Sequence, residues 1–237
     1  MVSVNIKATF VLIGGGNTNL KSEKPYETEK IDKTIVKLAD KKQPNFLFIG
    51  LASSFSDAYY DNMKKIYQSL GCKCQYLKKK NIINNPQIVE KKIKEADIIY
   101  FAGGDTIKLK EQLEEYNINT LLEEKIKQPC VIAGISAGAM ILCNQGLSDS
   151  MILREKSDKY ILVEGLKFVD INICPHYNRE ERKKQLKEMI KNEKIYSIDN
   201  KCAIVISQEK YSVIQEEKDC NAYICYKKNE NWIEEKI

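Results

Sequence analysis

Histidine is nearly absent from this sequence, since His176 is the only one among 237 residues. Metal sites built from several imidazoles are therefore excluded. Long apolar runs are absent too, and no stretch approaches the run of about 18 apolar residues that a membrane-spanning helix needs. The apolar run 9–13 stops at three glycines, well short of the apolar core of a signal peptide. We therefore expect a soluble, cytoplasmic protein with no membrane partner.

Paired C-x-x-C motifs are also missing, although the chain has eight cysteines. The spacing of Cys72 and Cys74 is a weak metal signal, and two half-buried strand thiols explain it better. Cys130 and Cys174 stand inside apolar runs, which is typical of buried free thiols. The cysteines therefore predict reduced thiols in a cytosol, with no metal centre.

A strong excess of one charge is lacking as well. The net charge of +5 is the small difference between 38 Lys and Arg and 33 Asp and Glu residues, which are mixed along the chain. The densest basic run, 78–80, has no interleaved aromatic residues, so we expect a solvated loop and no nucleic-acid partner. With 43% hydrophobic residues and no repeat or composition break, residues 1–237 are expected to form a single domain.

The chain does contain a regular alternation of short apolar runs and amphipathic stretches. The expected strands are 9–13, 46–51, 72–77, 97–102, 130–135 and 171–174, and the expected helices are 24–40, 57–70, 86–95, 106–115, 120–126 and 178–191. The helix at 178–191 is expected to be capped by Asn178. Further on, 202–207, 211–215 and 222–226 predict short antiparallel strands, and 149–159 predicts a polar loop. The pattern predicts a three-layer α/β fold in which helices cover both faces of a mostly parallel sheet.

Glycines stand at the ends of three of the expected strands, at 14–16, at 103–104 and at 134. Binding and chemistry gather at the carboxyl ends of parallel strands, so this convergence predicts a site there. The glycines at 14–16 also suggest a dinucleotide-binding G-x-G-x-x-G motif. Asn19 stands in the place of the third glycine, which makes that function a weak candidate.

The run 134–138, with the sequence GISAG, has the G-x-S-x-G pattern between an expected strand and an expected helix running from 139 toward 143. In a nucleophile elbow, small residues around the serine let the chain turn sharply and present the hydroxyl above the sheet. This makes Ser136 a candidate nucleophile. An ordinary glycine-rich turn with a helix-capping serine would give the same pattern.

A serine nucleophile needs a base, and His176 is the one histidine that could serve. It follows the expected strand 171–174 and so stands at a strand end, as Ser136 does. The backbone N–H groups of the glycines at 103–104, together with that of Ala137, could hold an oxyanion. These glycines could equally serve only to let the strand pass into a helix.

A carboxylate is expected to orient the imidazole and stabilise its cation. Asp199 stands at the end of a short apolar run and is the preferred candidate. Asp149 and Asp158 lie in the polar loop and are upstream alternatives. A turn formed by Asp199 with Asn200 is the competing structural explanation.

Together these segments resemble the peptidase E family of serine peptidases, whose relatives include cyanophycinase, on a scaffold similar to that of class I glutamine amidotransferases. The resemblance covers nearly the whole chain. It rests on Ile13-Gly14-Gly15-Gly16, Phe101-Ala102-Gly103-Gly104-Asp105, Ala133-Gly134-Ile135-Ser136-Ala137-Gly138-Ala139, Pro175-His176-Tyr177-Asn178 and Ser197-Ile198-Asp199-Asn200.

The resemblance implies that Ser136 is the nucleophile, that His176 is the base, and that Gly104 and Ala137 donate to the oxyanion. The third member in this family is a Glu or an Asp, and Asp199 is the residue that matches its position. The reaction would then be peptide hydrolysis through an acyl-enzyme, with neither a metal nor an organic cofactor.

Three further residues gain a role only through the resemblance. Asp149 matches an acid considered for the third position in the dipeptidase branch. Arg179 resembles the arginine that binds the substrate carboxylate in dipeptidases that cut after an N-terminal aspartate, and Gly103 is implied beside it in substrate binding. The loop between His176 and Arg179 is much shorter than in that branch, which puts the aspartate preference in doubt.

We therefore expect a serine-type peptidase acting on small peptides, with dipeptides the favoured class and a monomer or a homodimer as the assembly. One alternative is an esterase or amidase that uses the same serine. About 60 residues follow His176, whereas the histidine of an α/β-hydrolase usually lies near the C-terminus. The other alternative is a non-catalytic binding or stress-response module on the same scaffold.

Overall fold

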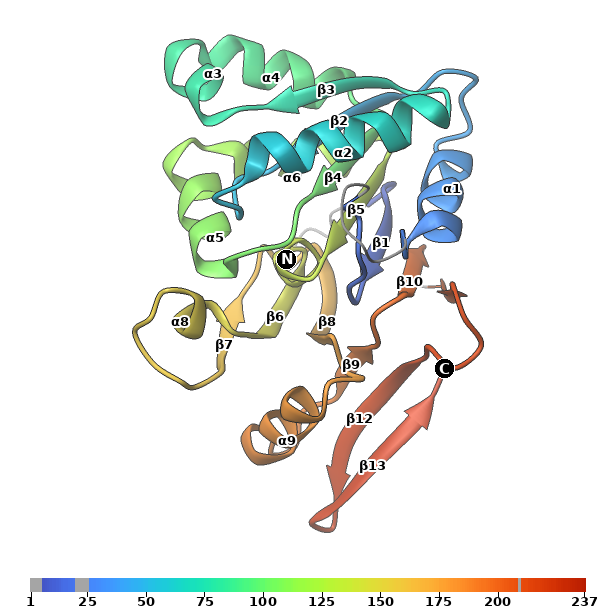
Figure 1. Cartoon of the computed structure of the whole chain (residues 1–237), viewed down its shortest axis with the longest axis vertical. Helices are drawn as coiled ribbons and strands as arrows, with labels where there is room; N and C mark the ends of the chain where they lie inside the picture. Colours follow the sequence, from blue (N-terminus) through green and yellow to red (C-terminus); the bar gives the residue numbers. More distant parts are fainter. Residues whose placement is uncertain (1–5, 20–25, 209) are drawn as a thin grey trace.

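The computed structural model of the chain describes residues 6–19, 26–208 and 210–237 (Figure 1). Its larger sheet has seven strands in the order β11-β10-β1-β5-β4-β2-β3. The strands β1, β5, β4, β2 and β3 are parallel, while β10 and β11 continue the sheet antiparallel to β1. The bounds are β1 (Thr9–Ile13), β2 (Asn45–Ile49), β3 (Lys73–Leu77), β4 (Ile98–Phe101), β5 (Val131–Ile135), β10 (Cys202–Ser207) and β11 (Lys210–Gln215).

Alternate residues of each central strand enter two different cores, which is why these strands are apolar throughout. In β4, Ile98 and Tyr100 pack with α1 and α2, whereas Ile99 and Phe101 pack with α4, α5 and α6. The helices on this sheet are α1 (Glu29–Leu38), α2 (Ser56–Ser69), α3 (Lys79–Asn84), α4 (Pro86–Glu95), α5 (Thr106–Glu115) and α6 (Ile118–Lys125). Burial of both sheet faces makes the carboxyl ends of the strands the accessible place for a site.

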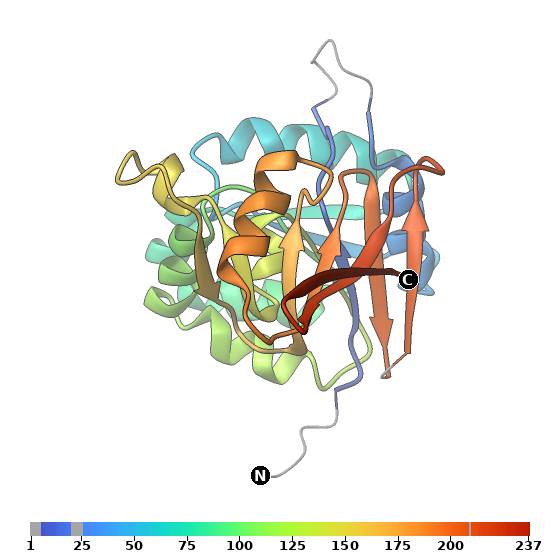
Figure 2. The same ribbon diagram turned by 90° about the horizontal axis from the view of Figure 1, so that it is seen from below.

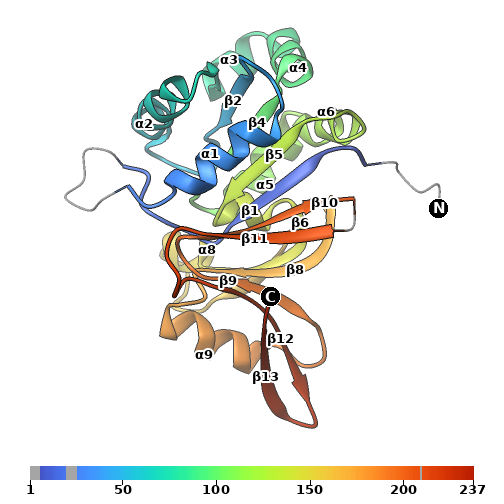
Figure 3. The same ribbon diagram turned by 90° about the vertical axis from the view of Figure 1, so that its right-hand side faces the viewer.

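A second sheet of six strands has the order β13-β12-β9-β8-β6-β7. Its bounds are β6 (Cys143–Ser148), β7 (Ile161–Glu164), β8 (Val169–Pro175), β9 (Ile195–Ile198), β12 (Ala222–Lys228) and β13 (Asn231–Lys236). The strands β6, β8 and β9 are parallel, and the other three pair antiparallel. The helix α9 (Glu180–Met189) packs on one face of this sheet and lies in front of its strands in Figure 2. With β12 and β13 it occupies the end of the molecule away from α2, α3 and α4 (Figure 3).

The α/β class and the parallel strands flanked by helices are confirmed, but several details of the sequence prediction were wrong. The strands β6, β7 and β13 were not predicted. The helix expected to run on toward residue 143 is a single turn, α7 (Ala137–Met140), and the loop expected at 149–159 contains the short helix α8 (Ser150–Leu153). The first part of the helix expected at 24–40 lies outside the described residues at 24–25, and α1 begins only at Glu29.

The cap predicted for α9 was also wrong. Arg179, not Asn178, occupies the N-cap position and has an extended backbone. The Asn178 side chain turns away from the helix, and its Oδ1 accepts a hydrogen bond of 3.1 Å from the backbone N–H of Asn200. Asn178 therefore joins the start of α9 to the loop after β9.

The glycine segment after β1 joins the two sheets. The Ile13 carbonyl accepts from the N–H of Ser136 at 3.0 Å, and the Gly14 carbonyl accepts from the N–H of His176 at 3.0 Å. One residue further on, the Gly15 carbonyl accepts from the N–H of Lys201 at 2.8 Å. Three strand ends from two sheets are thereby held against one short stretch of chain.

In the described part of the chain, no helix has the length and apolar character needed to cross a membrane.

Candidate active site

Ser136 stands in a sharp turn between β5 and α7. Its backbone has φ 53° and ψ −112°, a conformation that residues with a side chain rarely adopt. The turn depends on the neighbouring glycines, because a Cβ at Gly134 would lie 2.1 Å from the Gly138 carbonyl oxygen and one at Gly138 would lie 2.2 Å from that of Phe101. Such backbone strain costs about 1–3 kcal/mol and is often found at functional sites. The geometry is that of the predicted nucleophile elbow.

His176 lies at the end of β8 and reaches Ser136 from the second sheet. Its Nε2 is 2.8 Å from the Ser136 Oγ. The His176 backbone also has a positive φ, 57°, and its N–H is fixed by the Gly14 carbonyl. The structure therefore places the two residues that the sequence singled out within hydrogen-bond distance of each other.

Asn200 occupies the other side of the imidazole. Its Oδ1 lies 2.6 Å from the His176 Nδ1. An amide oxygen can only accept, so Nδ1 carries the proton in this pair and Nε2 is left to accept the proton of the Ser136 hydroxyl. A Cβ added at Gly15 would lie 2.1 Å from this Oδ1, which shows how closely the chain packs against the pair.

Asp199 does not contact His176, contrary to the sequence prediction. Its carboxylate is buried and points to the other side of the chain, where Oδ2 accepts from the backbone N–H of Asn221 at 2.9 Å. Burial raises the pKa of Asp199. Asp199 and Asn200 follow β9 directly, and their side chains take different partners: Asn200 faces the imidazole and Asp199 faces Asn221. In the structure the residue of this turn that contacts His176 is Asn200, the neighbour of the predicted Asp199.

Asp149 is engaged elsewhere too. Its Oδ2 forms an ion pair of 2.9 Å with Arg182, whose side chain is fully buried. The Arg182 guanidinium also donates to the carbonyl of Leu147 and lies 4.7 Å from the centre of the Tyr160 ring. Sequence reasoning did not find Arg182, because a charged residue in a charged helix normally faces solvent.

Burial lowers the pKa of His176 to about 4. The hydrogen bond to Asn200 raises the pKa and so opposes this effect, the positive charges of Arg182 and Arg179 lower it, and the negative charge of Asp149 raises it. The imidazole is therefore neutral near pH 7, as a group that must accept a proton requires.

The predicted oxyanion donors lie beside the serine. A Cβ added at Gly103 would be 3.6 Å from that of Ser136, so this loop is in contact with the elbow. Gly104 has φ 140°, and a Cβ there would lie 2.5 Å from the Ala52 carbonyl oxygen, which explains why glycine stands at this position. Among the described residues, the N–H groups of Gly104 and Ala137 donate to no backbone carbonyl. Both are thus free to meet a ligand oxygen.

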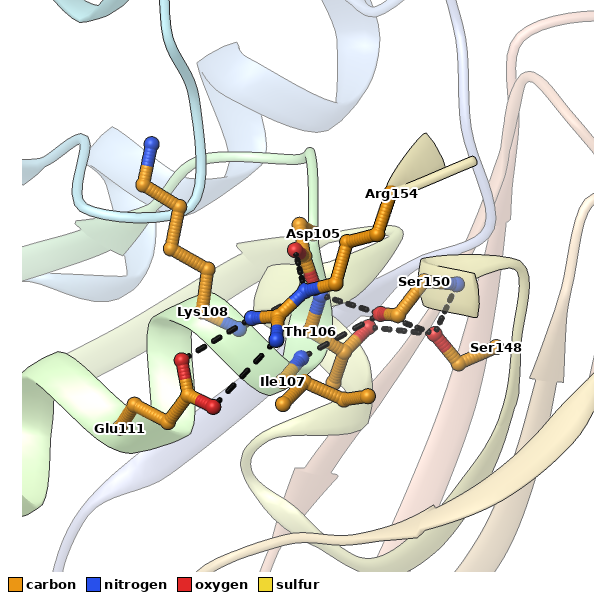
Figure 4. A network of polar contacts seen from close by, with 8 residues as sticks. All are labelled: Asp105, Thr106, Ile107, Lys108, Glu111, Ser148, Ser150 and Arg154. Atoms are coloured by element: carbon orange, nitrogen blue, oxygen red, sulfur yellow. Dashed lines mark hydrogen bonds and ion pairs between the residues drawn. The ribbon is translucent and has the colours of Figure 1, made fainter. Parts of the chain in front are cut away.

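A polar network fixes the loop that carries Gly104 (Figure 4). Asp105 caps α5 by accepting a hydrogen bond of 3.1 Å from the N–H of Lys108. Its carboxylate also accepts a hydrogen bond from the Arg154 guanidinium. On the other side, the Ser150 Oγ accepts from the N–H of Thr106 at 3.0 Å. Ser150 of α8 and Arg154, which directly follows this helix, therefore hold the start of α5. The sequence pattern gave no signal for this role of Arg154.

Arg179 lies close to His176 but on the surface. Its N–H donates to the His176 carbonyl at 3.0 Å, and its side chain is exposed. Its guanidinium takes part in none of the ion pairs formed within the described part of the chain. A positive charge is thus available near the imidazole of His176.

The α/β fold and the strained serine paired with a histidine are features of a hydrolytic enzyme. Comparisons with known proteins agree with this class. Residues 10–214 match the family described as Peptidase family S51. The chain is 26% identical over 220 residues, 90% of both chains, to "Uncharacterized peptidase YgaJ" of Bacillus subtilis. It is 33% identical over 111 residues, 43% of this chain and 45% of the relative, to "Peptidase E" of Shewanella sp. strain W3-18-1.

A solved structure has the same fold over nearly the whole chain. The peptidase from an acI-B1 Actinobacterium superposes with a TM-score of 0.70 at 22% identity, covering 99% of this chain and 98% of that one. The putative peptidase E protein of Listeria monocytogenes gives a TM-score of 0.65 at 23% identity, covering 88% of this chain and 98% of that one. The chain belongs to peptidase family S51 and is a peptidase.

Proposed function

We propose that this peptidase is a serine enzyme that hydrolyses small peptides, with Ser136 as nucleophile and His176 as general base. The observation that carries the proposal is the 2.8 Å contact between the Ser136 Oγ and the His176 Nε2. A capping serine in an ordinary turn would need neither a strained backbone nor an imidazole on its hydroxyl. The membership of a peptidase family supports the same reaction.

In the proposed mechanism, His176 takes the hydroxyl proton while the Ser136 Oγ attacks the peptide carbonyl carbon. The N–H groups of Gly104 and Ala137 hold the oxygen as it becomes negative. Protonated His176 then gives the proton to the leaving amine, and the C–N bond breaks. Water, deprotonated by the same imidazole, hydrolyses the acyl-enzyme and restores the serine. These steps need neither a metal nor an organic cofactor.

For the substrate we propose short peptides, in particular dipeptides with an N-terminal aspartate. The support is the charge beside the site, where the exposed Arg179 has no acidic partner among the described residues. A guanidinium in such a place pairs well with a carboxylate. Gly103, which carries no side chain, leaves room for the peptide next to the serine. We place the enzyme in the cytoplasm, acting as a monomer or homodimer.

The test is hydrolysis of a dipeptide library by the wild type, Ser136→Ala, His176→Ala and the double variant. Each single variant should reduce kcat/KM to the background of the assay, and the double variant should be no worse, because the two groups act as one unit. Losses that multiply in the double variant would contradict a shared unit. Turnover of acyl esters with no turnover of any peptide would instead favour the esterase. Unchanged activity in Ser136→Ala would end the serine proposal.

A further inference from the structure

The amide side chain of Asn200 is the group on the far side of the imidazole from Ser136. Given the serine mechanism proposed above, on which this inference rests, we infer that Asn200 is the positioning residue for His176 and that the catalytic unit is Ser136–His176–Asn200. The third member of this unit is neutral. A peptidase with this unit relies on orientation of the base rather than on a carboxylate to stabilise it.

The position of Asn200 is fixed from three directions. Its backbone N–H donates to the Asn178 Oδ1 at 3.1 Å, and the next N–H, that of Lys201, donates to the Gly15 carbonyl at 2.8 Å. The Gly15 backbone also packs directly against the Asn200 side chain, since a Cβ there would lie 2.1 Å from Oδ1. The oxygen that meets His176 is thus held by contacts that do not involve the imidazole.

The contact between the Asn200 Oδ1 and the His176 Nδ1 orients the imidazole ring. With Nδ1–H donated to the Asn200 Oδ1 at 2.6 Å, the ring holds the tautomer in which Nε2 faces the Ser136 hydroxyl. A carboxylate in the same place would add the attraction of a full negative charge to the imidazolium, whereas an amide adds only a dipole. The only carboxylate of this turn, that of Asp199, is directed to Asn221.

The charges around His176 do not replace the missing carboxylate. Two cations face it from the start of α9, Arg179 and Arg182, and one anion, Asp149, faces it from the end of β6. That anion is paired with Arg182 at 2.9 Å. Burial and these cations keep the pKa of His176 low, at about 4. A neutral third member therefore leaves the base unprotonated in weakly acidic solution, and hydrolysis should keep its full rate there.

The experiment compares the wild type, Asn200→Ala, Asn200→Asp and the neighbouring control Asp199→Asn. Two readouts are used, the pH dependence of kcat/KM on the best dipeptide and the rate of reaction with a fluorophosphonate probe. Because His176 is the only histidine, NMR of its single set of imidazole signals also reports its titration directly. Thermal unfolding of each variant separates a loss of folding from a loss of orientation.

Asn200→Ala is expected to slow both reactions by about 100-fold, the usual cost of a misplaced catalytic group. Asn200→Asp is expected to stay active, while the acid limb of its pH profile and the imidazole titration move upward by about 1–2 pH units, since a negative charge within hydrogen-bond distance favours the imidazolium. Asp199→Asn is expected to leave both midpoints where they are in the wild type.

Wild-type rates and an unmoved titration in both Asn200 variants would overturn the inference. So would a midpoint that moves in Asp199→Asn but not in Asn200→Asp. Should Asn200→Ala fail to fold, Asn200→Asp and its titration still decide the question. The serine mechanism itself fails only if Ser136→Ala keeps its activity and its reaction with the probe, so the two failures are distinguishable.

Discussion

A single methyl group added at Gly15 should slow the peptidase without removing any polar group from the site. The Cβ of Gly15→Ala would lie 2.1 Å from the Asn200 Oδ1 and 2.4 Å from the His176 Nδ1, and real Cβ atoms essentially never come closer than 3.0 Å to another heavy atom. The two side chains must therefore withdraw by about 0.9 and 0.6 Å. The φ of Gly15, 159°, is also one that residues with a side chain rarely adopt, so some backbone strain adds to the crowding.

A displacement of this size is enough to spoil proton transfer between Ser136 and His176. A misplacement of about 1 Å can cost about 100-fold in rate, so kcat/KM of Gly15→Ala should fall by about that factor. The assay is steady-state hydrolysis of the best dipeptide, with thermal unfolding measured in parallel. Combining Gly15→Ala with Asn200→Ala should add little further loss, because both changes act through the same ring.

The matched control is Gly71→Ala, at a glycine that has open space around it, since no atom lies within 4 Å of an added Cβ. Gly71 has φ 89°, so this variant should lose some stability but keep its kcat/KM. Full activity in Gly15→Ala would refute the argument that the glycine segment presses the His176–Asn200 pair into place. Equal losses of activity in the two variants would refute it as well.

Two more predictions concern the charges of the site. Arg179→Ala should raise KM selectively for dipeptides with an N-terminal aspartate and leave neutral dipeptides unchanged; a loss shared by all substrates would mean that Arg179 does not bind a substrate carboxylate. The second concerns stability. Because the pKa of His176 is lowered from 6.5 to about 4, the unfolded chain takes up a proton between these values and the folded chain does not. The free energy of unfolding should therefore fall on acidification from about pH 6.5 to 4, by up to about 1.4 kcal/mol per pH unit. Chemical denaturation of His176→Gln should lack this contribution, and identical slopes in the two proteins would contradict it.

The parts of the fold that could be predicted are those with a strong local pattern. The apolar strands such as β1 and β5 stand between amphipathic helices, and their position in the sheet follows from burial on both faces. β6, with the sequence CNQGLS, mixes polar and small residues and has no clear period. Only its pairing with β7 and β8 makes it a strand, and a single sequence does not display that pairing.

The residues of the candidate site could also be predicted only in part, and those that could have a clear signal in the sequence. Ser136 could be found because a nucleophile elbow has a local signature, and His176 because no other histidine competes with it. The partner of His176 could not be found from the sequence. Asp199 and Asn200 are adjacent, and which of the two side chains contacts the imidazole depends on how the backbone is oriented after β9. A carboxylate is the better partner on chemical grounds, but the backbone directs Asp199 to Asn221 and Asn200 to the imidazole. The orientation of the backbone, which a sequence does not display, therefore determines the contact with His176.

The place of β1 in the larger sheet has a consequence for the newly made chain. β1 lies between β5 and β10, so during synthesis its second edge stays open until the chain beyond Cys202 has been made. His176 and Lys201 likewise reach the carbonyls of 14–15 only late in synthesis. The elbow of Ser136 can thus form well before its base is in place. Ser136 and His176 of a growing chain are therefore brought together only after most of the chain has been made.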